Sequence, residues 1–124
     1  MIRTSIWGLV AYYLATGVYI AVLPLDFYHN GPGVSDTGPY NMHFLRDVGF
    51  AFLVSSTAIA YGLYQNQKAV MVFGALWLLI HGLFHLTLWV LHGMQLDGAA
   101  ITDMILVTIP AIAVFWLCLR FRAT

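Results

Sequence analysis

The chain has 124 residues, of which 61% are hydrophobic and 8% are charged, and its formal net charge is zero. Soluble domains contain about 25% charged residues, so this composition excludes an ordinary soluble domain. The balanced charge gives no indication of nucleic-acid binding. The one cysteine, Cys118, cannot form an internal disulfide, and there is no Cys/His zinc pattern.

Charged residues divide the chain into four apolar intervals. Three of them reach the length of about 20 residues that a membrane-spanning helix needs. The fourth, residues 104–119, can span if Asp103 and Arg120 lie at the two interfaces. The sequence therefore predicts an all-α membrane protein with one domain, residues 1–124. It is an up-down-up-down bundle of four transmembrane helices, at residues 5–25, 43–64, 69–93 and 102–120.

The first predicted helix, residues 5–25, follows Arg3. Its apolar stretch is too long for a signal peptide and no A-x-A cleavage site precedes Asp26, so we expect a retained helix. The connection at residues 26–42 contains prolines and three glycines, which predict irregular structure. A loop of this length is often a lid or a contact surface.

The second helix opens with the sequence HFLRD, and Asn41 is its expected N-cap. His43 lies at its start, and Arg46 and Asp47 follow one turn later. Arg46 and Asp47 point about 100° apart, so they do not pair with each other. Because ionised groups are expensive in hydrocarbon, each should face a partner on another helix.

The third helix carries the stretch HGLFHLTLWVLHG, residues 81–93, and a short inner connection makes it antiparallel to the second. At about 100° per residue, His81, His85 and His92 share one stripe, with His81 deepest. We expect this stripe to face inward, because imidazole nitrogens facing lipid would stay unpaired. In the fourth helix Thr102 is the expected N-cap, and Pro110 leaves the Leu106 carbonyl without its helical donor, which predicts a kink.

The basic residues indicate the orientation, because cytoplasmic flanks accumulate Lys and Arg. With the N-terminus inside, four of the five basic residues lie on the cytoplasmic side and all five aspartates lie outside. Both termini are then cytoplasmic, and the loop at residues 26–42 is external.

Together these helices predict an outward-opening polar pocket. Depth in the membrane allows Asp47 to meet His85 or His92, and Arg46 to meet Asp103 or Asp26. The predicted lining consists of the polar residues of the last three helices: His43, Arg46, Asp47, His81, His85, His92 and Asp103.

Three interpretations of the histidines stay open. His81 and His85 form an HxxxH pair that can chelate a metal ion, and a site of His43, His85 and His92 is the candidate set. Position 82 is Gly, so a zincin motif is absent, and two histidines on one helix cannot both be axial haem ligands. The histidines can also form interhelical hydrogen bonds with a purely structural role, or line a ligand or proton-handling pocket.

The pattern N-x-H-F-x-R-D-x-G at residues 41–49, with the long outer loop and four helices, resembles small bacterial membrane proteins of the DoxX-like kind. The resemblance implies an integral protein of the bacterial inner membrane. It further implies an association with quinone-linked oxidoreductases, as for some members of that group.

The first functional interpretation is a membrane binding or accessory protein whose pocket takes a small ligand, a quinone headgroup or a metal. Such a protein would lie in the lipid bilayer as a homo-oligomer or as a subunit of a larger complex. The alternatives are a small membrane oxidoreductase with a His-ligated metal or haem, and a purely structural subunit. The pattern assigns no catalytic residue.

Overall fold

The computed structural model describes residues 1–122, and all regular structure in that range is helical. Three long helices are continuous: α1 (Ile2–Val22), α3 (Met42–Tyr64) and α4 (Lys68–Leu91). The last long segment consists of α5 (Gly98–Thr102), the π-helical segment η2 (Asp103–Thr108) and α6 (Ile109–Arg120). By length and composition these four segments are long and apolar enough to cross a membrane, so the predicted all-α class with four possible spans is confirmed.

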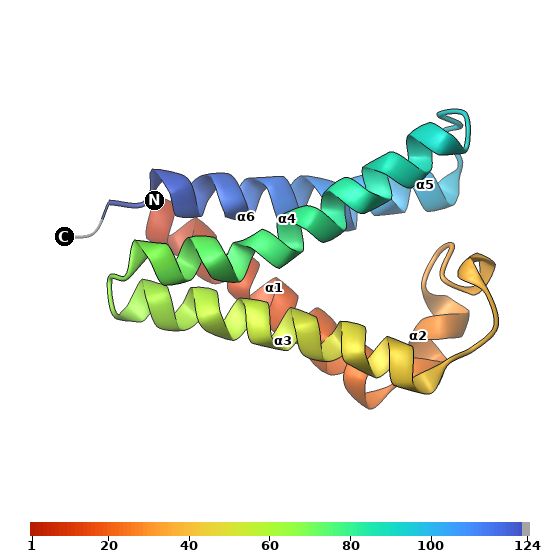
Figure 1. Cartoon of the computed structure of the whole chain (residues 1–124), viewed down its shortest axis with the longest axis horizontal. Coiled ribbons are helices and arrows are strands. Elements are labelled where there is room, and N and C mark those ends of the chain that lie inside the picture. Colours follow the sequence, from red (N-terminus) through yellow and green to blue (C-terminus); the bar gives the residue numbers. More distant parts are fainter. Residues whose placement is uncertain (123–124) are drawn as a thin grey trace.

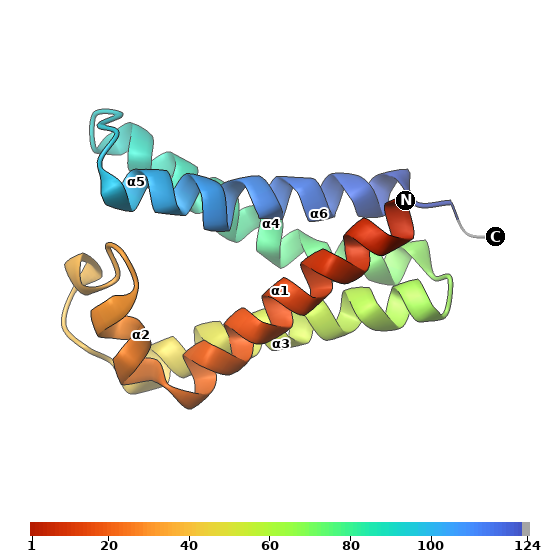
Figure 2. The ribbon, with the colours of Figure 1, turned by 180° about the vertical axis from the view of Figure 1, so that it is seen from behind.

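The long helices pack in the order α1, α3, α4 and α6. Figure 1 shows the start of α1, the turn between α3 and α4 and the end of α6 at one end of the molecule, with α2 and α5 at the other. We call these the terminal end and the loop end. Toward the loop end, the pair α1/α3 spreads away from the pair formed by α4 and the last segment (Figures 1 and 2).

Apolar side chains fill the space between the helices in the half of the molecule nearest the terminal end. Ile6, Ile59, Leu63, Met71 and Val114 are fully buried there. At the same end Arg3 donates to the Leu63 carbonyl (3.0 Å) and to Oδ1 of Asn66 (2.8 Å). Its guanidinium also lies over the ring of Phe121, 5.6 Å from the centroid. Arg3 therefore ties α1 to the end of α3 and to the residue after α6.

Glycines at positions 49, 62, 74 and 82 bring neighbouring helices close together. A Cβ at Gly74 would lie 3.0 Å from the Ser55 carbonyl oxygen in α3. A Cβ at Gly82 would lie 2.8 Å from Cβ of Ala111 in α6. Small residues at such positions permit the close packing of membrane helices.

The connection between α1 and α3 is more regular than the sequence predicted. It contains the short helix α2 (Pro24–Asn30) and the 3₁₀ turn η1 (Ser35–Thr37). Pro24 stands at the first position of α2, where the fixed φ of proline suits a helix and its missing N–H is not needed. Asp26 also accepts hydrogen bonds from the Tyr19 hydroxyl and from the Asn30 amide. The expectation of irregular structure was therefore wrong for residues 26–30, and the first helix ends at Val22 and not at residue 25.

The helix caps match the prediction at one position and differ at another. The Asn41 side chain accepts a hydrogen bond from the Phe44 amide at 3.1 Å, which confirms it as the N-cap of α3. The last segment begins earlier than predicted, because Asp97 accepts from the Ala100 amide at 2.8 Å and caps α5. Thr102 is not a cap, and its hydroxyl donates to the Gly98 carbonyl. Asp103 consequently lies within the helical segment and not at its start.

Candidate functional site

The centre of the candidate site is a bond between α4 and η2. Nδ1 of His85 donates to Oδ2 of Asp103 at 2.9 Å, and this hydrogen bond becomes a salt bridge when the imidazole is protonated. Within residues 1–122 no other basic side chain or histidine lies this close to a carboxylate. The side chains are 23% and 36% exposed, so solvent or a ligand can reach both. Nε2 of His85 and the second oxygen of Asp103 remain available for further hydrogen bonds.

His81 extends this centre toward the middle of the molecule through aromatic contacts. Its ring stacks on Trp77 with centroids 4.9 Å apart and meets Phe52 of α3 edge-on at 5.4 Å. The rings of His81 and His85 also meet edge-on, 4.7 Å apart. The inner part of the histidine stripe therefore faces other helices, as predicted, and His81 is its deepest histidine.

Asp103 reaches α4 because η2 is wound more widely than an α-helix. The Thr108 hydroxyl donates to the Gly82 carbonyl at 3.2 Å, so Thr108 and Asp103 both face α4. In an α-helix residues five positions apart point about 140° away from each other. A π-turn joins residues i and i+5 by a hydrogen bond and places them near one face. The Ile109 amide donates to the Met104 carbonyl in this way.

A hydroxyl from α1 supports the widened turn. Pro110 has no N–H, so the Leu106 carbonyl, four residues earlier, lacks a helical donor. The Tyr12 hydroxyl donates a hydrogen bond to that carbonyl. The sequence predicted a kink at Pro110; the structure instead has a π-helical segment before it, and the Leu106 carbonyl is bonded to another helix.

The next residue of α1, Tyr13, differs from Tyr12 because its hydroxyl has no hydrogen-bond partner in the described residues. Its side chain is only 2% exposed and stacks on Phe52, with centroids 5.8 Å apart. Its hydroxyl is the one buried side-chain polar atom of the described range without a hydrogen-bond partner. The sequence interpretation did not include Tyr12 or Tyr13, although Pro110 signalled a carbonyl in need of a donor.

The polar residues of α3 do not join this centre. The structure pairs His85 with Asp103 and not with Asp47, which is exposed. Nε of Arg46 donates to the Ala21 carbonyl in α1 at 3.2 Å and not to Asp103 or Asp26. A cation near the carbonyl end of a helix is favourable, which accounts for this contact. The expectation that Arg46 and Asp47 form ion pairs with residues of other helices was therefore wrong.

The two outermost histidines, His43 and His92, also lie apart from the His85–Asp103 bond. His43 is exposed in the first turn of α3. His92 is exposed, and its Nδ1 bonds the Leu88 carbonyl of its own helix at 2.7 Å. Across residues 1–122 no three His, Cys, Asp or Glu side chains come together in a way that could hold a metal ion. The structure therefore does not assemble the candidate metal set of His43, His85 and His92.

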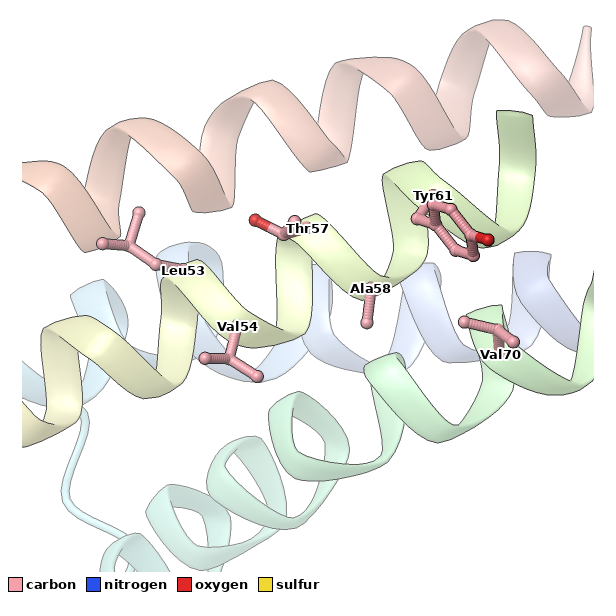
Figure 3. Close-up of a pocket in the computed structure, with 6 residues that line it drawn as sticks. All are labelled: Leu53, Val54, Thr57, Ala58, Tyr61 and Val70. Carbon is pink, nitrogen blue, oxygen red and sulfur yellow. The ribbon is translucent and has the colours of Figure 1, made fainter. Parts of the chain in front are cut away.

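A shallow hollow of the described surface lies away from this site. Figure 3 shows it along α3, next to the first residues of α4. It is an open, almost entirely apolar groove without histidine or aspartate, lined by Leu53, Val54, Thr57, Ala58, Tyr61 and Val70. A surface of this kind suits contact with lipid chains in a membrane-spanning protein.

Comparisons of the chain with family models, curated proteins and solved structures found no match. The resemblance to DoxX-like proteins stays a prediction.

Proposed function

We propose that the protein is a small integral membrane binding or accessory protein. Its site is formed by Asp103, His85 and His81 and is reached from the loop end. The observation that carries this proposal is the His85–Asp103 hydrogen bond, which places a partly exposed imidazole and carboxyl group within two apolar helical segments. Ionisable groups at such positions are expensive and are commonly kept for function.

The chemistry of the site favours an amphipathic ligand. Nε2 of His85 and the free oxygen of Asp103 can bond a polar headgroup. Phe84, which is 56% exposed and lies edge-on to the His85 ring at 6.1 Å, offers an apolar surface beside them. A planar headgroup with hydrogen-bonding oxygens, of which a quinone is one example, meets both requirements.

The orientation belongs to the same proposal. We place both termini in the cytoplasm and the loop end outside, in an up-down-up-down order across a bacterial inner membrane. Support comes from the charges, because Arg3, Lys68 and Arg120 lie at the terminal end, whereas Asp26, Asp36 and Asp97 lie at the loop end. The proposed site then opens outward.

A purely structural role is the second candidate. It is favoured by the fact that His85 and Asp103 already satisfy each other and join α4 to η2. Interhelical hydrogen bonds of this kind stabilise membrane proteins by about 0.6–1.7 kcal/mol.

Analysis of co-purified small molecules separates the two candidates. We would extract the wild type, Asp103→Asn and the remote control Asp36→Asn into polymer-bounded lipid discs. Organic extracts would be compared by mass spectrometry, with absorption spectra and metal content recorded on the same samples. A ligand site predicts a molecule present with the wild type and Asp36→Asn and depleted with Asp103→Asn. If no small molecule co-purifies, or if the same amount co-purifies with the wild type and both variants, the structural role is favoured.

A further inference from the structure

We propose that Tyr12 of α1 is a positioning residue for the polar site, because its hydroxyl holds the widened turn that aims Asp103 at His85. This inference rests on the site described above. It concerns the geometry of that site and not the identity of a ligand.

The first step is that both side-chain bonds between η2 and α4 require the widened turn. His85 and Gly82 are three residues apart and lie on the same face of α4. Asp103 and Thr108, which bond them, are five residues apart. A regular α-helix that kept Thr108 at Gly82 would turn Asp103 about 140° away from that direction.

The second step is that Pro110 leaves a backbone group inside the widened turn to be satisfied. The Leu106 carbonyl lies inside η2, and Pro110 cannot donate to it. In a membrane-spanning segment no bulk water is at hand, so an unpaired carbonyl strongly disfavours the conformation that exposes it. A donor held on another helix therefore fixes the direction of this carbonyl, and with it the orientation of η2 about its own axis.

The third step is that Tyr12 is this donor and comes from a different part of the molecule. Its hydroxyl donates to Leu106, which lies 94 positions away in the chain. The Tyr12 backbone is held in turn within α1, where its carbonyl also accepts from the Thr16 hydroxyl at 3.0 Å. Since α1 packs mainly against α3, the Tyr12 hydroxyl is a specific link from that pair to η2.

The test observes the His85–Asp103 bond directly, in full-length protein labelled with ¹⁵N-histidine in lipid discs. The proton on Nδ1 of His85 gives an NMR resonance whose exchange with solvent reports how firmly it is bonded to the carboxylate. Asp103→Asn defines the signal of the broken pair. Tyr12→Phe should speed this exchange about three- to tenfold, the factor expected from one lost hydrogen bond.

Tyr19→Phe is the matched control. It also removes one phenolic hydroxyl from α1, but that hydroxyl donates to Asp26, which is outside the site. It should leave the His85 resonance unchanged. An unchanged resonance in Tyr12→Phe would overturn the proposal. Faster amide exchange around Leu106 alongside it would show that Tyr12 supports the turn without positioning Asp103.

The outcome is separable from that of the proposed function. A disturbed His85 resonance in Tyr12→Phe, with no co-purified ligand in the wild type, would retain the positioning role and reject ligand binding. If a co-purified ligand is lost in Asp103→Asn but the His85 resonance is the same in Tyr12→Phe and the wild type, ligand binding is retained and the positioning role of Tyr12 is rejected.

Discussion

Nδ1 of His85 lies 2.9 Å from Oδ2 of Asp103, and this pair joins two helical segments that the chain connects only through an exposed turn at residues 92–97. Because each side chain satisfies the other, removing either one leaves a polar group without its partner. The effect on stability is limited by the partial exposure of both side chains.

His85→Ala and Asp103→Ala should each lower the free energy of unfolding by about 1–2 kcal/mol, close to measured interhelical hydrogen bonds in membranes. The double variant should cost little more than either single one, since the two residues share one interaction. Thermal unfolding in one detergent would measure this. Asp47→Ala, at an exposed position, should differ from Asp36→Ala by less than about 0.5 kcal/mol. A larger loss in Asp47→Ala than in Asp103→Ala would contradict the observed pairing.

At the terminal end, Arg3→Ala should lower stability by about 1–2 kcal/mol, because Arg3 makes two charge-assisted hydrogen bonds and a ring contact. Arg3→Lys keeps the charge but loses the forked geometry, so it should recover only part of the loss. Arg122→Ala, which removes an exposed cation, is the control. Similar melting of all three variants would mean that the contacts of Arg3 add nothing to stability beyond what an exposed cation contributes.

Tyr13→Phe should be neutral or stabilising by up to about 1 kcal/mol, since it removes a buried hydroxyl that has no partner in the described structure. Tyr12→Phe removes the neighbouring hydroxyl and should be destabilising. Chemical or thermal unfolding of both variants side by side would test the contrast. A marked loss of stability in Tyr13→Phe would reveal a partner for its hydroxyl, such as a buried water or a bound ligand.

The four spans could be predicted from the sequence because long apolar intervals leave a membrane helix as the main solution. The inward direction of His81 and His85 followed from the cost of unpaired ring nitrogens in lipid. The partner of His85 could not be found in this way, because a constant rotation of about 100° per residue does not describe η2. The early cap at Asp97 also moved Asp103 into the segment, whereas the sequence placed it at an interface.

Pro110→Ala tests whether Tyr12 stabilises the protein by bonding the Leu106 carbonyl that Pro110 leaves without a donor. The substitution supplies an N–H for the Leu106 carbonyl, so Tyr12→Phe should cost about 1 kcal/mol less in this background than in the wild type. A double-mutant cycle of the two substitutions, measured by unfolding, gives that difference. Strictly additive losses would show that Tyr12 stabilises the protein through something other than this carbonyl.

The orientation can be tested with cysteine labelling in a Cys118→Ala background. A cysteine at Ser35, in the exposed turn η1, should react with a membrane-impermeant maleimide in intact cells. A cysteine at Lys68, at the opposite end of the molecule, should react only after the membrane is opened. The reverse pattern would invert the proposed topology and place the candidate site toward the cytoplasm.

The π-helical segment has a consequence for chain length. Deleting one residue between Asp103 and Thr108 would make these two residues four positions apart, which in an ordinary α-helix is about 40° and hence one face. Both bonds to α4 could then form without a widened turn. A single-residue deletion usually misaligns a packed helix, yet within η2 it would leave the register of both flanking halves intact. Shorter versions of this protein can therefore share its architecture, provided that the missing residue falls in this one turn.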